Sequence, residues 1–431
     1  GTVIEPGLLD QSTNNFLAAA VSDGVRAGLA YVDISTSEFV TGEFRASDLR
    51  DELHRLNPSE LIVDSTAKEL FDPRRSSSTV VRHLDESLLD FELSSAHLME
   101  HFKASTLEAF GCSNMFLAVV AASAVLNFVG ETQFGAIPQL TSLRTESINA
   151  YMRLDTKALR DLEVFSSSIE KADGHTLYRT VNHTKTAMGA RTLKGWLTRP
   201  LIDSTDIQRR QAVVSAFFND SSSRVRIQDL LSKVSDLERL INRVRTNTAN
   251  PRDLASIRAG LTVIPSLITA LPEDVLPGGA VIGRLHPSIT AVELLEAAIA
   301  DDPSLAVGEG SAIREGFDQE LDEARSLSGD SRSSIAALER EYRTLLGNKS
   351  LKIGFNRVFG YYVEVTNINL HLVPVSFERR QTLVNAERFI TPQLKDLESR
   401  ILTARDRISE LERGIFRRVC AEVAIQSERI M

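Results

Sequence analysis

The sequence predicts a mainly α-helical, multi-domain protein with a small α/β domain at its N-terminal end. Its 431 residues are enough for about three domains of ordinary size. Strand-like and helix-like patterns alternate only near the N-terminal end, whereas most later segments have helical spacing. Near the C-terminal end, two unusually long helical patterns enclose a short segment of strand-like composition. We therefore expect an α/β domain, a large helical domain, and a pair of long helices with a small strand-containing module.

The α/β domain is predicted over residues 2–110. Runs of β-prone apolar residues indicate strands, and an amphipathic stretch between them indicates a helix. The predicted order is strand, strand, helix and strand, at residues 27–35, 38–44, 46–56 and 61–63.

The helical domain is predicted over residues 111–311. It begins with an apolar, alanine-rich stretch at residues 114–129. Helix-start signals recur along it, such as Asp203 and the Asn-Pro pair at residues 250–251. Proline, glycine and acidic residues between residues 272 and 310 indicate its end.

Two long helices are predicted around the last module, at residues 318–346 and 392–431. We assign the first helix and the module together to one domain, residues 312–391. The second helix, residues 392–431, is assigned to the helical domain, to which the chain returns. The apolar stripe of the first helix consists of Ile335, Leu338, Tyr342 and Leu345. The second has a coiled-coil-like repeat of seven: Leu394, Ile401, Ile408 and Ile415, with Leu397, Ala404 and Leu411 between them. A helix of about 40 residues is roughly 60 Å long, so we expect the pair to form an arm.

Charge is distributed unevenly along the chain. The formal net charge is −9, which by itself disfavours a nucleic-acid partner. Between Arg340 and Lys395, however, nine basic residues stand against four acidic ones, so this segment has a charge of +5 and the remainder −14. A basic module at the end of a long arm indicates a clamp for an extended polyanion such as double-stranded DNA.

Nine polar residues of the basic module are predicted to bind DNA. Cations and amides of this kind contact phosphate oxygens and position a duplex without reading its bases. They are Lys352, Asn356, Arg357, Arg379, Arg380, Gln381, Thr382, Asn385 and Arg388. The alternative is a solvated surface in which Arg388 has a structural role. We expect the aromatic residues of the module to form its small core rather than platforms for stacked bases.

Composition disfavours other settings. Apolar stretches are interrupted well before the roughly 20 residues that span a bilayer, and there is no signal sequence. Two cysteines, Cys112 and Cys420, cannot form a disulfide framework. We therefore expect a cytoplasmic protein without a membrane anchor. The chain begins with Gly1 and ends at Met431 within a helical pattern, so we expect it to be part of a longer protein.

The main enzymatic alternative is a metal-dependent nuclease. Asp33 in the first predicted strand, Glu52 on the following helix and Asp64 after the next strand would hold metal ions if the chain brought them together. The competing interpretation gives each carboxylate an ordinary structural role at a turn, on a helix surface or at a strand end.

Two shorter motifs do not support an enzyme. Residues 97–101 match the H-x-x-E-H pattern of zinc peptidases, but a recognisable third ligand is missing, so we expect a surface helix that has two histidines, His97 and His101. Residues 347–350 resemble the end of a phosphate-binding loop, yet Asn348 stands where the second glycine belongs. We expect no metal and no nucleotide in this chain.

Motifs in three regions, in a fixed order, cover almost the whole chain. Examples are Thr-Val-Ile-Glu-Pro-Gly at residues 2–7 and Phe-Gly-Tyr-Tyr-Val-Glu-Val at residues 359–365. The others lie at residues 14–17, 28–35, 151–155, 188–191, 196–201, 236–240, 250–254, 313–317, 350–356 and 381–389. In this order they resemble the MutS family of bacterial DNA mismatch-recognition proteins.

The resemblance implies an RNase H-like connector domain without nuclease activity, a helical lever or core, and a clamp that closes over duplex DNA through backbone contacts. It also implies a MutL-like partner docked on the connector, a homodimeric parent protein, and ATP and Mg²⁺ bound by an ATPase domain outside this chain. The family's mismatch-reading Phe-x-Glu motif does not occur here. A family member specialised for recombination, without a mismatch domain, is a further possibility.

Two positions depart from the family pattern. Val384 stands where the family commonly has a lysine before Asn385, so we expect one phosphate contact to be missing and Asn385 to take more of the role. Ser37 replaces a glycine and is expected to alter only a hairpin. We predict a non-enzymatic central part of a MutS-like protein that acts in DNA mismatch repair, binds duplex DNA weakly and without mismatch preference, and couples mismatch recognition to the ATPase.

Overall fold

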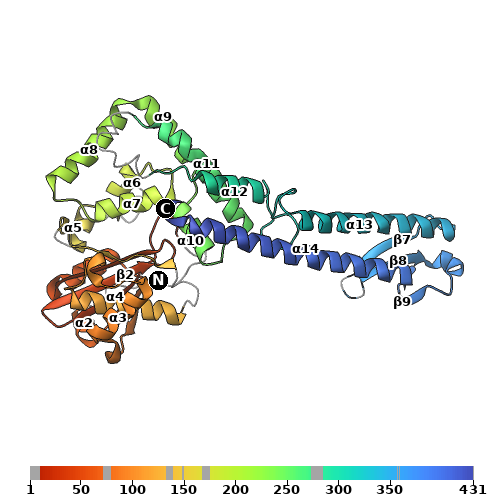
Figure 1. Ribbon diagram of the computed structural model, residues 1–431, viewed down its shortest axis with the longest axis horizontal. Coiled ribbons are helices and arrows are strands. Elements are labelled where there is room, and N and C mark those ends of the chain that lie inside the picture. Colours follow the sequence, from red (N-terminus) through yellow and green to blue (C-terminus); the bar gives the residue numbers. More distant parts are fainter. Residues whose placement is uncertain are drawn as a thin grey trace. The chain divides into compact units, whose positions relative to one another are not determined.

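The computed structural model describes residues 10–70, 79–132, 139–147, 150–166, 175–272, 285–356, 358 and 360–430 (Figure 1). Within these residues the chain is mainly helical, with a six-stranded mixed sheet and a four-stranded antiparallel sheet. The predicted class of a mainly α-helical, multi-domain protein is confirmed. The chain forms two compact units: Gly1–Ala249, Ser256–Val292 and Ala421–Met431 in the first, and Asn250–Ala255 and Glu293–Cys420 in the second.

The six-stranded sheet of the first unit has the order β5-β4-β1-β2-β3-β6. Strands β1, β2 and β3 form an antiparallel meander, and β4, β5 and β6 are added in parallel. The strands are β1 (Leu17–Ser22), β2 (Arg26–Asp33), β3 (Glu38–Arg45), β4 (Glu60–Val63), β5 (Val80–His83) and β6 (Arg144–Thr145). The predicted strands correspond to β2, β3 and β4. The prediction missed β1, because every residue of Leu-Ala-Ala-Ala-Val-Ser is buried and the strand therefore lacks alternation.

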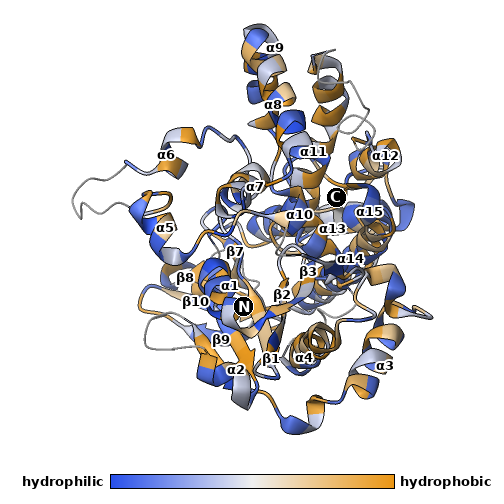
Figure 2. Cartoon of the chain, turned by 90° about the vertical axis from the view of Figure 1, so that its left-hand side faces the viewer, coloured by the Kyte–Doolittle hydropathy of each residue, from blue (hydrophilic) through white to orange (hydrophobic). Residues whose placement is uncertain are grey.

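Helices cover both faces of this sheet. They are α1 (Leu49–Leu56), α2 (Ser65–Leu70), α3 (Phe91–Phe102) and α4 (Phe116–Thr132). Helix α4 is apolar around most of its circumference and packs with Leu17 and Ala19 of β1, whereas α1 packs with Ala18 and Ala20 on the opposite face. Figure 2 shows the apolar character of β1, β2 and α4. The alternation of β1 between two buried layers places the core on both sides of the sheet.

Gly28 of β2 allows α4 to lie directly on the sheet. A Cβ atom at this position would be 2.1 Å from the backbone carbonyl carbon of Leu117, which no side-chain movement can relieve. We expect Gly28→Ala to lower the free energy of unfolding by about 1–3 kcal/mol or more, because backbone has to shift. Urea denaturation checks this. Gly195→Ala on α7 (Ala187–Thr198) is the control, since nothing lies within 4 Å of the added atom. Equal loss in both variants would contradict the explanation.

The remaining helices of the first unit begin at side-chain caps. Asp155, Thr176, Thr186, Asp203, Asp220 and Asp236 each accept a backbone N–H at a helix start. Their helices are α5 (Thr156–Asp161), α6 (Leu177–Val181), α7, α8 (Ser204–Asn219), α9 (Ser221–Leu231) and α10 (Leu237–Arg245). Helix α11 (Pro251–Ala270) begins with proline after Asn250. The helix starts predicted at Asp203 and at residues 250–251 are confirmed.

The second unit contains the long helix α13 (Gln319–Leu345) and most of the antiparallel α14 (Pro392–Ile425), after the larger part of α12 (Ile289–Ala298). The predicted seam of α14 is confirmed, because Leu394, Ile401, Ile408 and Ile415 are all buried. On α13 the prediction is wrong at one position: Leu345 is 67% exposed, and Leu346 is buried instead. Both residues fit the helical period, and packing against the small sheet selects Leu346. The last predicted helix also ends earlier, at Ile425, before a short α15 (Ser427–Ile430).

Candidate nucleic-acid interface

The basic module is a four-stranded antiparallel sheet with the order β7-β8-β10-β9. Its strands are β7 (Lys352–Asn356), β8 (Gly360–Thr366), β9 (Glu378–Thr382) and β10 (Ala386–Ile390). Val363, Val365 and Phe389 pack against buried residues of α13 and α14, such as Tyr342 and Leu394. We call the four-stranded sheet the tip sheet, and the side on which these apolar residues lie its inner face. Because side chains alternate along strands, the residues between these apolar positions form an outer face.

Arg388 organises the outer face. Strand register places Lys352, Glu364, Arg388 and Gln381 in one row across the sheet. The Nε of Arg388 donates to Glu364 at 3.0 Å, and its Nη1 donates to the Oε1 of Gln381 at 3.0 Å. The guanidinium carbon lies 4.2 Å from the ring centroid of Tyr362, and its side chain is only 19% exposed. Arg388 therefore has a structural role in addition to its predicted DNA contact.

Tyr362 depends in turn on a glycine. Its ring lies over Gly354 of β7, where a Cβ would approach the ring to 2.7 Å. Glycine, tyrosine and arginine on three adjacent strands thus form a stack across the outer face. Tyr362, Gly354 and Glu364 were not among the residues predicted to form the site. The register of the strands, which sequence spacing alone does not fix, is what brings them together.

The nine predicted DNA-binding residues occupy different parts of the tip sheet. Lys352, Asn356, Gln381 and Arg388 share the outer face. Arg379 and Thr382 pair with residues on the inner side at the edge strand β9, Arg380 lies at a register shift, and Asn385 lies in the turn before β10. Arg357 lies outside the described residues. The positions are compatible with a DNA-binding tip, and their contacts with DNA stay a prediction.

The exposed cations of β9 differ from Arg388 in their surroundings. Arg379 is 63% exposed at its side chain and lies 3.3 Å from a carboxylate oxygen of Glu387, and Arg380 is 45% exposed and lies 3.3 Å from Glu378. The exposed pair of Arg380 with Glu378 is worth about 0–1 kcal/mol, so a phosphate group can replace that carboxylate at little cost, whereas Glu387, the partner of Arg379, is only 14% exposed. Arg379 and Arg380 are therefore the more available cations of the tip.

The expected aromatic core of the tip is confirmed in part. Phe377 and Phe389 are buried and lie near Tyr342, while Tyr361 packs against the same cluster. The expectation is wrong for Phe355, which is 52% exposed near the end of β7, where it makes an edge contact with Tyr361. It is also wrong for Tyr362, whose ring lies on the outer face under Arg388. Phe359 lies outside the described residues.

The three carboxylates of the nuclease hypothesis do not converge. Strand pairing places Asp33 beside the start of β1 and Asp64 beside its end. This separation is roughly five residues, or about 16 Å along a strand. Asp33 accepts the N–H groups of Asn15 and Ser35, and Asp64 accepts those of Ser22 and Ala67. The nuclease alternative is therefore not supported.

Glu52 has a different environment, because it binds Arg55 and Arg199. In the described ranges no group of three or more histidines, cysteines or carboxylates is placed to hold a metal ion. His97 and His101 instead hydrogen-bond through ring nitrogens to the Ser123 hydroxyl and the Leu140 carbonyl. Burial, followed by the nearby His101, lowers the pKa of His97 and so disfavours its charged form.

Residues 347–350 form the turn after α13 rather than a phosphate cradle. The Oδ1 of Asn348 accepts both the N–H and the hydroxyl of Ser350, at 2.9 and 2.7 Å. The amide of Ser350 is therefore engaged with Asn348, and the amides of Gly347 and Asn348 donate to the carbonyls of Thr344 and Arg343. Among the helices that the structure describes, none combines the length and the apolar character needed to cross a bilayer.

These features define a class of multi-domain, mainly helical proteins in which a mixed α/β sheet precedes a pair of long helices that ends in a small, cation-rich β-sheet. The family model of MutS domain II matches residues 15–142, and that of MutS domain III matches residues 157–431. The chain therefore belongs to the MutS family, which confirms the resemblance predicted from its motifs.

Similar proteins span the same region. The DNA mismatch repair protein MutS of Dehalococcoides mccartyi is 40% identical over 422 residues, covering 97% of this chain and 49% of the relative. The proteins of the same name from Protochlamydia amoebophila and Methanosarcina barkeri are 37% and 35% identical over 440 and 455 residues, covering all of this chain and 51% and 50% of the relatives. The chain thus spans about half the length of these relatives.

Proposed function

We propose that this chain is the non-catalytic central part of a MutS-like DNA mismatch repair protein, and that its arm clamps duplex DNA through the phosphate backbone. The observation that supports the proposal most directly is the group of exposed cations on the tip sheet of a MutS-family chain. Lys352, Arg379 and Arg380 would contact phosphate, while Arg388 holds the outer face in shape. Contacts of this kind do not distinguish matched from mismatched duplexes.

The domains of the family supply the rest of the proposal. The RNase H-like connector would extend beyond the predicted residues 2–110, because α4 and β6 pack on or pair with its sheet and the match to MutS domain II reaches residue 142. The residues after it up to 311, together with residues 392–431, would be the lever or core, and residues 312–391 the clamp. The connector would dock a MutL-like partner, and the lever would couple mismatch recognition to an ATPase elsewhere in a cytoplasmic, homodimeric parent protein. ATP and Mg²⁺ would bind to that ATPase, with no cofactor in this chain.

Charge reversal on the tip tests the clamp. Arg379→Glu together with Arg380→Glu is expected to weaken binding of a fluorescent 30-base-pair duplex at least tenfold at low salt and to flatten the dependence of affinity on salt, because fewer counterions are released. Anisotropy titrations with matched and single-mismatch duplexes at several salt concentrations measure both effects. This chain without substitutions, called the parent chain below, should bind the matched and the mismatched duplex equally.

The matched control reverses two exposed arginines outside the tip, Arg160 and Arg209, which also lie beside aspartates. This variant has the same change in net charge and should lose much less affinity. If both variants bind alike, general charge rather than the tip sheet holds DNA. If the tip variant binds like the parent chain, the clamp proposal is wrong.

A further inference from the structure

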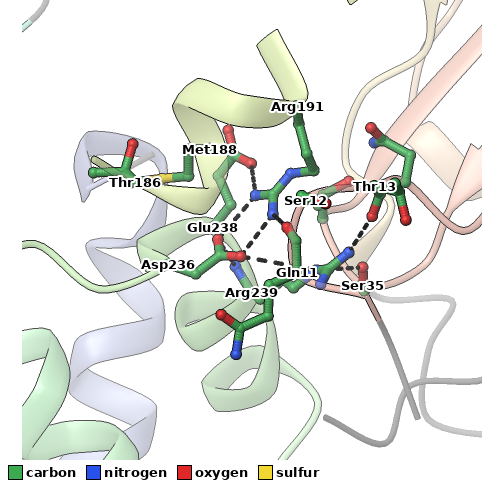
Figure 3. A network of polar contacts seen from close by, with 12 residues as sticks. Gln11, Ser12, Thr13, Ser35, Thr186, Met188, Arg191, Asp236, Glu238 and Arg239 are labelled. Atoms are coloured by element: carbon green, nitrogen blue, oxygen red, sulfur yellow. Dashed lines mark hydrogen bonds and ion pairs between the residues drawn. The ribbon is translucent and has the colours of Figure 1, made fainter. Parts of the chain in front are cut away.

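Two buried arginines join the sheet of the first unit to its helices (Figure 3). Arg191 lies on α7, and Arg239 lies in the first turn of α10. The guanidinium of Arg191 donates to both carboxylate oxygens of Asp236, at 2.6 and 2.9 Å, and to Glu238 at 2.5 Å. Because Asp236 caps α10, this bidentate pair fixes α7 to the N-terminal end of α10.

The same two guanidinium groups also donate to the segment that leads into β1. Arg191 donates to the carbonyl of Gln11 at 3.0 Å. Arg239 donates to the carbonyls of Asp10 and Thr13, at 3.0 and 2.7 Å. Figure 3 shows both arginines pointing toward this segment from the two helices. Three backbone carbonyls within residues 10–13 are thus bound by side chains that come from far along the chain.

The turn after β2 adds to these contacts. The Nε of Arg239 donates to the hydroxyl of Ser35 at 3.1 Å, and Ser35 donates to Asp33 at 2.7 Å. The hydroxyl of Ser37 donates to the Oδ1 of Asn242 on α10 at 2.6 Å, and Asn242 donates to the carbonyl of Ile34. The position where the sequence departs from the family, Ser37, therefore makes a contact with a helix and does more than alter a hairpin.

Burial makes this group of contacts cooperative. Arg191 and Arg239 are each 7% exposed, so each charge depends on its full set of partners. Burial lowers the pKa of Arg191, but hydrogen bonds to Asp236 and Glu238 outweigh it and raise the pKa above its ordinary value. Burial and the nearby Arg191 lower the pKa of Arg239. Losing one carbonyl partner would leave a buried cation only partly bonded, so the contacts form or break together.

We propose that Arg191 and Arg239 form a transmission joint, which binds residues 10–13 to α7 and α10 so that a displacement of the entry segment of β1 moves both helices. The two arginines are positioning residues. A role of the joint in coupling mismatch recognition to the ATPase rests on the proposed function. The existence of the joint does not. A second contact supports the joint: Arg199, which ends α7, binds Glu52 of α1, so α7 is held to the α/β sheet at both ends.

The test measures domain geometry without DNA. Spin labels are placed at Lys68→Cys on α2 and Thr192→Cys on α7, both exposed positions, and Cys112 and Cys420 are buried. The unmodified joint should give one narrow distribution of distances by electron paramagnetic resonance. Arg191→Gln with Arg239→Gln should broaden it to at least twice the width. Hydrogen exchange at the amides of Asn15 and Ser35 should accelerate at least tenfold.

Arg239→Lys serves as the milder variant if the double variant does not fold, because it keeps the charge but has one nitrogen in place of the three that donate to separate acceptors. It should broaden the distribution less than the double variant. The control is Arg209→Gln, which removes an exposed ion pair on α8 and should change neither readout. A narrow distribution and unchanged amide exchange in the Arg239 variants would overturn the joint. Neither readout depends on DNA binding by the tip sheet, so the joint and the clamp proposal can fail independently.

Discussion

Glu412→Ala is expected to destabilise the second unit by about 3 kcal/mol, because it removes a carboxylate that satisfies two buried and two part-buried backbone donors. Glu412 lies on α14 and its side chain is fully buried. One carboxylate oxygen accepts N–H groups at 2.8 and 2.9 Å and the other at 2.9 and 3.4 Å; the donors are Gly308, Gly310, Ala312 and Ile313. These four amides line the loop that leads toward α13.

The size of the effect follows from the donors left behind. Each buried N–H without a partner costs about 1–3 kcal/mol, so two unpaired amides cost about 2–6 kcal/mol even if water reaches the other two. Arg325 of α13 also loses a partner, since its Nη2 lies 3.4 Å from Glu412. Gly308 and Gly310 have positive φ angles of 98° and 87°, so the loop needs this external anchor to keep its shape.

Urea unfolding and hydrogen exchange measure the prediction for Glu412. The amides of Gly308, Gly310 and Ala312 should exchange at least a hundredfold faster in Glu412→Ala, while the six-stranded sheet of the first unit stays protected. Glu410→Ala is the control, because Glu410 lies on the same helix with an exposed side chain that pairs with Arg407. Equal unfolding midpoints for the two variants would show that the buried carboxylate does not stabilise the loop.

The long helices could be predicted well because their signal is local and periodic. The heptad repeat of α14 places Leu394, Ile401, Ile408 and Ile415 on one stripe, and all four are buried. The misassigned Leu345 shows the limit of this signal, since two neighbouring positions fit the same period. Strand β1 was missed for a related reason: a strand buried on both faces has no alternation to detect.

The candidate site was predictable in composition but not in arrangement. The clustering of cations around residues 352–388 is visible in the sequence. The stack of Gly354, Tyr362 and Arg388 is not, because it depends on the register of three strands. The transmission joint is still less visible, since Arg239 reaches carbonyls more than 200 residues earlier in the chain. Contacts of this kind leave no periodic pattern.

Arg199→Met is expected to lower the free energy of unfolding of the first unit by about 3 kcal/mol at neutral pH, because it breaks a buried ion-pair group. Arg199 binds Glu146, and its Nη2 lies 3.0 Å from Glu52. The hydroxyl of Tyr31 donates to Glu146 at 3.0 Å, and Arg55 lies 2.6 Å from Glu52. Glu52 therefore keeps a cation in the variant, whereas Glu146 loses its guanidinium partner.

The pH dependence distinguishes this explanation from simple loss of packing. Burial raises the pKa of Glu146, but the charge and hydrogen bond of Arg199 outweigh burial and hold the pKa below its ordinary value of 4.5. In the parent chain, Glu146 thus contributes stability that is present above pH 4.5 and is lost as the pH falls through the lowered pKa. Without Arg199, burial dominates and raises the pKa. At pH values above this raised pKa, the charged carboxylate of Glu146 lowers the free energy of unfolding of the variant. This loss disappears as the pH falls through the raised pKa.

The stability difference between the parent chain and Arg199→Met should therefore be largest near pH 7 and shrink toward pH 4.5. Urea unfolding at four pH values across this range measures it. Glu146→Gln added to Arg199→Met should remove most of this pH dependence, because the carboxylate that lost its guanidinium partner no longer titrates, while Glu52 keeps Arg55. Arg209→Met is the control: its pair with Asp206 is exposed on both sides, so about 0–1 kcal/mol is expected at every pH. A difference that stays constant with pH would show that Arg199 acts through packing alone.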